Sequence, residues 1–297
     1  MNAPKLIKGL MTKRCRVGNT PLIGPPELKR QYNLPHLLIK DESRNEFGTF
    51  KDRRNKLVVD RARKQHPDKL VLITSGNSGY SLARLAEGIE AKVICIVDKR
   101  IDESIKEHLV KHSHKVVETD LSDKIFTPEE TIALARESAS EVIWDATNEY
   151  HEAFRSIVKE IKREKPDWLV TPVGSGEAYF GLFEGLKMYG MKTKLVGVGV
   201  HALVDHELEL SKTPSMADKL YTPFTPYKSR IEREILRAGH LYVQVSEEQI
   251  KKAYQAVNSI ISCEPSSAAV FGALPGLNLS RSSKVIVVNS GKAIWAV

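Results

Sequence analysis

The alternation of short apolar runs with longer amphipathic segments constrains the fold of this chain more than any other feature. The short runs are rich in Val, Ile and Leu, and the segments between them carry apolar residues at helical spacing. Such alternation is typical of βαβ units, in which helices cover both faces of a mostly parallel sheet. We therefore expect an α/β protein.

The pattern also places the individual elements. The expected strands are Leu37–Lys40, Leu70–Thr74, Lys92–Val97, Lys115–Glu118, Trp168–Pro172, Lys194–Val200, Tyr242–Val245 and Lys284–Asn289. The expected helices are Phe50–Gln65, Gly79–Gly88, Ile101–His112, Thr127–Ser138, His151–Lys165, Phe180–Tyr189, Ser246–Ser262 and Ser266–Leu274. The proline-rich stretch Ser211–Arg230 interrupts the alternation and is expected to form a long surface excursion.

Several classes of protein do not fit this sequence. No apolar run approaches the ~18 residues of a membrane span, and the N-terminus lacks the apolar core of a secretory signal. We therefore expect a cytoplasmic protein with no membrane partner. The three cysteines are scattered, without His or Cys at ligand spacing, so neither a disulfide framework nor a metal site is expected.

The net charge indicates the kind of partner. Lys and Arg number 45 against 37 Asp and Glu, which gives +8. Nucleic-acid-binding proteins usually concentrate their basic residues in a stripe or tail, whereas here they alternate with acids along the chain. We therefore expect a small anionic ligand and no nucleic acid.

Three predicted turns between a strand and a helix carry residues suited to such a ligand. Ligands of open α/β sheets bind at the carboxyl ends of the strands, where loops lead into helix N-termini. The first turn ends at Lys51, near the start of a helix that Thr49 could cap. The helix dipole lowers the pKa of a lysine there, and a neutral amine can form a Schiff base. From this segment alone, a solvated lysine on a basic helix is the other interpretation.

The other two turns could bind anions through hydroxyls and backbone N–H groups. Residues 74–79 read TSGNSG, which also fits an ordinary helix N-cap. Residues 174–178 read GSGEA, but no acidic residue ends the next strand as a dinucleotide site requires. This loop also lacks the lysine and hydroxyl of a P-loop, which disfavours nucleotide hydrolysis.

In their order, these turns and further short motifs resemble a known family over nearly the whole chain. The matching stretches are Gly18–Leu22, Lys40–Glu42, Gly48–Arg53, Thr74–Gly79, Pro166–Trp168, Gly174–Ala178, Ser215–Asp218, Glu264–Ala269 and Asn289–Gly291. They resemble the fold type II pyridoxal phosphate (PLP) enzymes, of tryptophan synthase beta-like architecture. Within that group the motifs are most similar to threonine synthase and cysteine synthase.

The resemblance implies a role for each matching residue. Lys51 would hold the cofactor covalently, and Asn77 would lie beside its ring hydroxyl. Ser290 would face the pyridine nitrogen. The phosphate cup would consist of Gly174, Ser175, Gly176, Glu177 and Ala178, and the substrate carboxylate would be bound by Thr74, Ser75, Asn77 and Ser78.

The resemblance also implies an architecture and a class of reaction. It implies a smaller domain of residues 41–146 inserted into a larger one of residues 1–40 plus 147–297, assembled as a homodimer. The implied activity is a PLP-dependent lyase or synthase that eliminates or replaces a group at the β or γ carbon of an amino acid, as threonine synthase does. Cysteine synthase-like replacement and serine/threonine dehydration are alternatives from the same class. A non-catalytic binding protein is a further alternative, against which Lys51, Asn77 and Ser290 argue.

Two places depart from the family pattern. Glu46 and Phe47 stand where threonine synthases usually have a small Pro-Thr or Pro-Gly pair. Glu177 puts an acid into a loop normally made of glycines and hydroxyl residues. A carboxylate facing the phosphate would repel it, so we expect the Glu177 side chain to turn away while its backbone N–H still donates.

Overall fold

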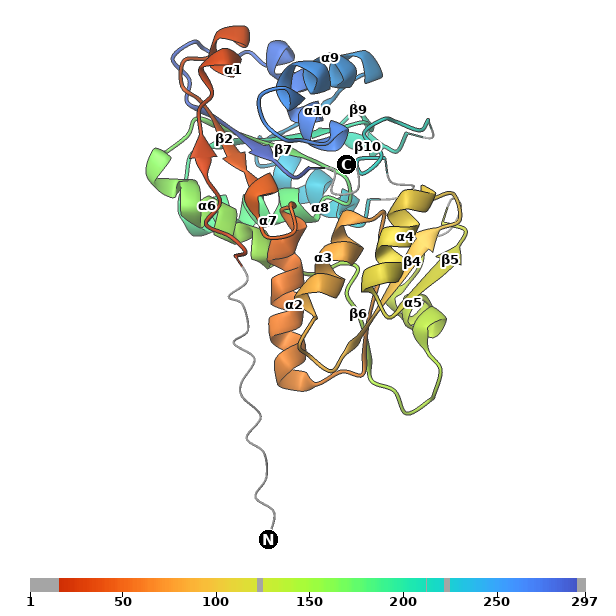
Figure 1. Cartoon of the computed structure of the whole chain (residues 1–297). Coiled ribbons are helices and arrows are strands. Elements are labelled where there is room, and N and C mark those ends of the chain that lie inside the picture. Colours follow the sequence, from red (N-terminus) through yellow and green to blue (C-terminus); the bar gives the residue numbers. More distant parts are fainter. Residues whose placement is uncertain (1–15, 122–124, 212, 222–224, 293–297) are drawn as a thin grey trace.

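Two parallel sheets organise the chain. The computed structural model describes residues 16–121, 125–211, 213–221 and 225–292. Within them lie a six-stranded sheet of order β1-β2-β12-β7-β8-β11 and a four-stranded sheet of order β5-β4-β3-β6. Figure 1 shows each sheet with its own helices, as an upper and a lower unit. The protein is therefore an α/β protein with mostly parallel sheets covered by helices, as the alternation predicts.

The larger sheet is parallel apart from its edge strand. Strand β1 (Leu22–Ile23) pairs antiparallel with β2 (Leu37–Asp41). The remaining strands, β7 (Trp168–Pro172), β8 (Lys194–Gly199), β11 (Leu241–Gln244) and β12 (Val285–Asn289), run parallel to β2 and to one another. Successive side chains of a strand point to opposite faces, so each face has its own core. One core packs under α9 (Glu247–Asn258) and α10 (Pro265–Ala273), and the other under α6 (Arg155–Ile161) and α7 (Glu177–Met188).

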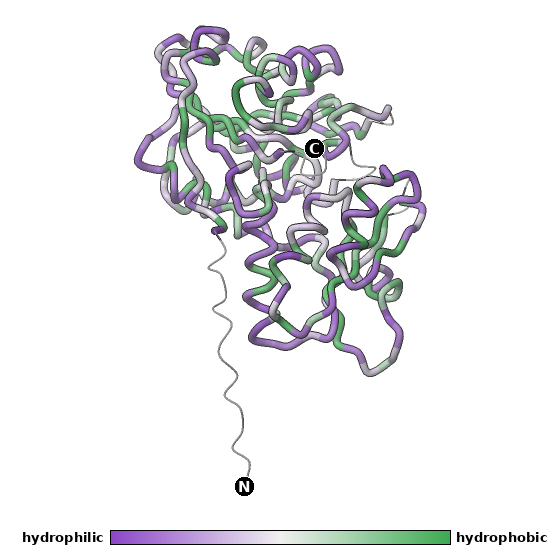
Figure 2. The backbone as a smooth tube through the Cα atoms, viewed as in Figure 1, coloured by the Kyte–Doolittle hydropathy of each residue, from purple (hydrophilic) through white to green (hydrophobic). Residues whose placement is uncertain are grey.

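The smaller sheet repeats this arrangement. Strands β3 (Lys69–Ile73), β4 (Lys92–Asp98), β5 (Lys115–Thr119) and β6 (Ile143–Asp145) are all parallel. Helices α2 (Lys51–Gln65), α3 (Asn77–Leu85) and α4 (Glu103–His112) cover one face, and α5 (Pro128–Ala135) covers the other. All four strands fall within residues 41–146, and the domain boundaries themselves stay a prediction. Figure 2 shows hydrophobic residues concentrated along the strands of both sheets.

The expected strands are all present, whereas several helices and short elements differ from expectation. The other elements of the structure are α1 (Pro26–Gln31), α8 (Lys228–Arg230), the hairpin β9 (Ala202–Val204) and β10 (Glu207–Glu209), the π-helix η4 (Ile231–Leu236), and the 3-10 turns η1 (Glu42–Arg44), η2 (His151–Phe154), η3 (Lys162–Glu164) and η5 (Leu274–Gly276). Strand β6 and helix α1 are among the elements that the pattern did not predict, because they are too short to show periodicity.

Several expected helices were wrong in their bounds. Helix α7 begins three residues before the expected Phe180, and α5 and α9 end before the expected Ser138 and Ser262. The segment His151–Lys165 is not one helix, since 3-10 turns flank the short α6. Its first turn packs very closely on α7: a Cβ added to Gly181 would lie 2.1 Å from the His151 carbonyl oxygen. Helix α3 begins at Asn77, two residues before the expected Gly79, because Gly76 adopts φ 129° at its N-cap and lets the chain turn earlier.

None of the helices within the described residues is long and apolar enough to cross a membrane.

The two units are joined near the start of α2. Thr49 forms an antiparallel bridge with Gly291, just beyond β12, and the Phe50 N–H donates to the Ser290 carbonyl at 2.8 Å. The N-terminus of a helix of the smaller unit is thereby attached to the carboxyl end of a strand of the larger one.

Candidate active site

Lys51 is the first residue of α2 and lies next to the end of β12. Its backbone N–H donates to Thr49 Oγ1 at 3.3 Å, although the N-cap position itself belongs to Phe50 and not to Thr49. Burial lowers the pKa of the Lys51 ammonium, and the positive charges of Arg54 and Lys219 lower it further against two nearby carboxylates. Burial disfavours the charged form because water no longer solvates it. The amine is thereby favoured as a neutral nucleophile and base.

The turn after β3 leads directly into α3. Thr74 Oγ1 accepts hydrogen bonds from the N–H groups of Gly76 and Gly79, both at 3.0 Å, which fixes the shape of the turn. The Ser75 side chain is exposed, while Asn77 and Ser78 are buried. The N–H groups of Asn77 and Ser78 belong to the first turn of α3, where no carbonyl of the helix itself can accept them. These donors and the nearby hydroxyls suit an anion such as a carboxylate.

Asn77 connects this turn to the larger unit. Its Nδ2 donates to Glu264 Oε2 at 3.0 Å, and the same carboxylate lies 3.0 Å from Lys219 Nζ. Within the described residues, Asn77 Oδ1 is buried without a hydrogen-bond partner. Sequence reasoning gave Glu264 and Lys219 no role, because only the tertiary structure brings them to Asn77. The one sequence feature that could have indicated Glu264 is its position in the stretch Glu264–Ala269, which resembles the family.

The glycine-rich loop after β7 is tightly enclosed. Gly176 adopts φ 88°, and a Cβ there would lie 2.8 Å from Tyr227 Cβ. A Cβ on Gly174 would lie 2.3 Å from the Lys219 carbonyl oxygen. The Tyr227 N–H also donates to the Ser175 carbonyl at 3.2 Å. Lys219 and Tyr227 thus pack so closely against the loop that only glycine fits at positions 174 and 176, and α7 begins directly after the loop.

Glu177 starts α7, and its carboxylate is fully engaged. Oε2 lies 2.9 Å from Arg54 Nε, and Oε1 accepts the Tyr150 N–H at 2.8 Å. Glu177 and Arg54 are 5% and 2% exposed. The acid in the loop is therefore neutralised by a cation from α2, as a buried charge requires.

Ser290 is buried at the end of β12, where its hydroxyl forms a hydrogen bond with Ser267. Sequence reasoning gave Ser267 no role. Ser290 Oγ lies 2.6 Å from Ser267 Oγ, which also accepts the Gly291 N–H and lies 2.9 Å from the Gly291 carbonyl. Each hydroxyl has one proton. Ser290 can donate to a further acceptor when Ser267 gives its proton to Ser290 rather than to that carbonyl.

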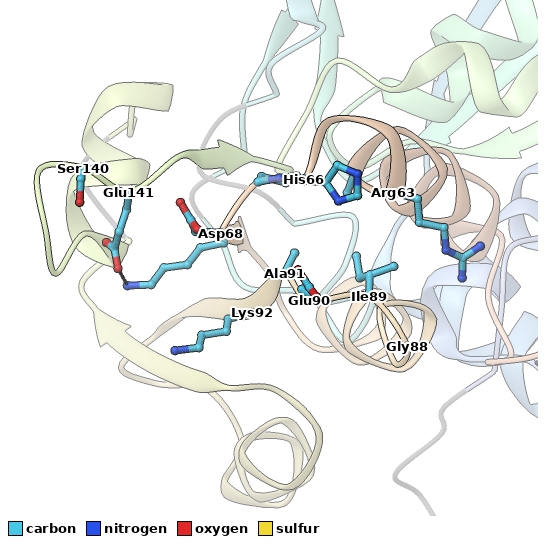
Figure 3. A pocket seen from close by; sticks show the side chains of 13 residues that line it. Arg63, His66, Asp68, Gly88, Ile89, Glu90, Ala91, Lys92, Ser140 and Glu141 are labelled. Carbon is cyan, nitrogen blue, oxygen red and sulfur yellow. Dashed lines mark ion pairs between the residues drawn. The ribbon is translucent and has the colours of Figure 1, made fainter. Parts of the chain in front are cut away.

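A separate pocket lies elsewhere on the smaller unit. Figure 3 shows it lined by side chains that include Arg63, His66, Lys92 and Glu141. Lys92 begins β4, so this pocket is at the amino end of the sheet. The Thr74–Ser78 turn follows the carboxyl end of β3, and the pocket is therefore not part of the candidate site. Among the described residues, no group of three or more His, Cys, Asp or Glu could hold a metal ion.

The family model described as "Pyridoxal-phosphate dependent enzyme" matches residues 15–291. The chain belongs to this family. It is a PLP-dependent enzyme of fold type II, and its cofactor is pyridoxal phosphate. The family suggests an amino acid as the class of substrate.

Solved structures share the fold across almost the entire chain. The O-acetylserine-dependent cystathionine beta-synthase of Helicobacter pylori has a TM-score of 0.79 and 20% identity, covering 95% of each chain. Maize serine racemase has a TM-score of 0.77 and 18% identity, covering 93% of this chain and 88% of its own. The L-serine ammonia-lyase of Rhizomucor miehei has a TM-score of 0.75 and 20% identity, covering 94% and 95%. At these identities the likeness shows the fold alone.

The residues at the site fit this cofactor. Lys51 offers an amine whose pKa is lowered, and Asn77 has an unpaired buried oxygen. The loop 174–178 offers N–H groups at a helix N-terminus for a phosphate, and its one acid already has a partner. The roles given to the individual residues remain predictions from their resemblance to the family.

Proposed function

We propose that this enzyme is a lyase that eliminates or replaces a leaving group at the β or γ carbon of an amino acid. The observation that carries the proposal is the neutral hydroxyl pair of Ser290 and Ser267 at the end of β12. A carboxylate there would keep a pyridine nitrogen protonated, whereas a hydroxyl donates to an unprotonated nitrogen. Such a ring withdraws electrons less strongly, which favours prompt expulsion of a leaving group over transamination.

The residues around Lys51 divide the work. The cofactor, when bound, supplies an electron sink for the bond broken at the substrate α-carbon. Lys51 takes the proton from that carbon, because burial lowers the pKa of its ammonium and thereby favours the neutral, basic amine. The turn from Thr74 to Ser78 holds the substrate carboxylate, with Ser75 and Ser78 as hydroxyl donors and Thr74 also shaping the turn.

Within this class, the motifs favour a threonine synthase-like substrate, an amino acid whose hydroxyl is phosphorylated or acylated. The net charge of +8 is compatible with such an anionic substrate. Cysteine synthase-like replacement and dehydration of serine or threonine remain the alternatives. The proposed assembly is a homodimer, which light scattering of the purified enzyme would test.

The visible absorption spectrum of the holoenzyme tests the proposal. Spectra are recorded before and after addition of O-phospho-L-homoserine, O-acetyl-L-serine, L-serine and L-threonine, and the released phosphate, acetate or ammonia is measured. Release of a leaving group without conversion of the cofactor to pyridoxamine phosphate is expected. Sustained transamination with added keto acids, or racemisation as the sole reaction, would overturn the proposal.

A further inference from the structure

Arg54 contacts both the turn after β3 and the loop after β7 through its guanidinium group. The residue lies on α2, three positions after Lys51. Its Nη1 donates to Ser78 Oγ at 3.1 Å, its Nε pairs with Glu177, and its Nη2 donates to the Ala146 carbonyl. One guanidinium therefore touches the turn after β3, the loop after β7 and the chain between the two units.

Ser78 is held at two of its atoms. Besides the contact of Arg54 with its hydroxyl, Asn55 Nδ2 donates to the Ser78 carbonyl at 2.8 Å. Asn55 Oδ1 in turn accepts from Arg54 Nη1 at 2.8 Å. Asn55, Arg54 and Ser78 are 0%, 2% and 7% exposed. Such a set of buried, mutually bonded groups fixes the direction of the Ser78 side chain.

The chemistry of the donor decides the direction of the Ser78 proton. A guanidinium only donates, so Ser78 Oγ must accept from Arg54. The single proton of Ser78 is then directed away from Arg54. A charge-assisted bond to the oxygen also polarises the O–H group, which makes it a better donor. Glu177 balances the positive charge, so that Arg54 can stay buried without a counter-ion from the substrate.

We propose that Arg54 is a positioning residue that makes Ser78 a dedicated hydrogen-bond donor to the substrate carboxylate. The inference rests on the proposed function, in which the turn from Thr74 to Ser78 receives that group. It deepens the function by making recognition of the carboxylate depend on a residue of α2. It also explains why an acid stands in the loop after β7: Glu177 neutralises the cation that orients Ser78.

The test compares glycine with glycinamide, which have no side chain and differ at the carboxylate. Both compounds are titrated into the holoenzyme, and binding is followed by the cofactor absorbance. The dissociation constant of glycinamide divided by that of glycine is the carboxylate preference, which measures recognition of the carboxylate. We expect Arg54→Lys to reduce this ratio on the order of tenfold, because lysine lacks the planar fork that reaches Ser78 and Glu177 together. In a Ser78→Ala background, Arg54→Lys should have no further effect on the ratio.

The controls separate positioning from a general structural role. Arg61→Lys changes an arginine of the same helix that pairs with Glu152, and it should leave the ratio unchanged. If Arg54→Lys fails to fold, the double variant Arg54→Gln with Glu177→Gln replaces it, because this variant leaves no unpaired buried charge. Its ratio of dissociation constants should also be reduced. Cofactor affinity and the midpoint of denaturant unfolding are measured for every variant.

Each outcome supports or overturns a particular claim. If Arg54→Lys or the double variant has the same ratio of dissociation constants as the wild type, the role of Arg54 is overturned. The role is also overturned if the effects of Arg54→Lys and Ser78→Ala on this ratio are additive. If the ratio is unchanged in these variants but reduced in Ser75→Ala, the carboxylate site is supported and only the inference about Arg54 fails. A holoenzyme that binds neither compound, or both equally, overturns the proposed carboxylate site itself.

Discussion

The turn after β3 and the loop after β7 have the same local design, yet they differ in what they leave open. Both lead from a buried parallel strand through a glycine with positive φ into a helix. The first presents the exposed Ser75. The second is enclosed by Lys219 and Tyr227, and its helix begins with the buried Glu177.

This difference shows that a glycine-rich turn is defined by its neighbours as much as by its own residues. An acid at the start of a helix interacts favourably with the helix dipole, but it also occupies an anion-binding position. In the loop after β7, Arg54 draws the carboxylate toward α2 and Tyr150 binds its second oxygen. In the proposed roles, the loop after β7 binds a phosphate through its backbone donors, whereas the turn after β3 also offers side-chain donors to a substrate.

The largest expected effect comes from Lys51, at the start of α2, because the proposed roles of both turns depend on it. Lys51→Ala should lower turnover roughly a thousandfold or more, because the proton at the α-carbon then has no base. Borohydride reduction followed by peptide mapping should find the cofactor on Lys51 in the wild type and nowhere in the variant. Lys56→Ala, which removes a surface lysine of the same helix paired with Asp60, is the matched control. Cofactor on any other lysine would disprove the assignment.

The second prediction concerns the acid that distinguishes the two turns. Glu177→Gln should lower the free energy of unfolding by about 3–5 kcal/mol, because Arg54 is left as an unpaired buried charge. Denaturant titration at constant cofactor concentration measures the change. Glu152→Gln, at a partly exposed pair with Arg61, should cost less than about 1 kcal/mol. Equal costs at the two sites would show that burial of the Glu177 pair has no special consequence.

Ser75→Ala tests the open turn. Losing one hydrogen bond to a charged group should cost about 1.5–3 kcal/mol, or roughly 10- to 100-fold in kcat/KM. Cofactor affinity should be unchanged, since the phosphate is assigned to the other loop. Steady-state kinetics and cofactor titration of the same preparation provide both values. Unchanged turnover would remove Ser75 from the substrate site.

Ser175→Ala is the counterpart in the enclosed loop and has the smallest expected effect. Its Oγ already accepts the Glu177 N–H at 3.4 Å, so the loss of its own donor should weaken cofactor binding by only about 1 kcal/mol. The KM for the substrate should stay constant. If Ser175→Ala instead raises the KM and spares cofactor affinity, the roles of the two turns are reversed.

The sequence by itself determined the elements whose signals are local. Apart from the short β1 and β6, the strands of both sheets follow from short apolar runs, and the positions of the turns follow from glycines and hydroxyl residues at their ends. The order of the motifs also placed Lys51, Asn77 and Ser290 in one family pattern. Periodicity could not divide the segment His151–Lys165, because its first 3-10 turn lies where the segment packs against Gly181.

Only the tertiary structure decided which side chains balance one another. The pairs Arg54 and Glu177, Asn77 and Glu264, and Ser267 and Ser290 are each separated along the chain. Each pair meets because the packing brings separate elements together. A local pattern carries no information about such partners, because a buried charge or hydroxyl is satisfied by whichever group the packing brings within hydrogen-bond distance.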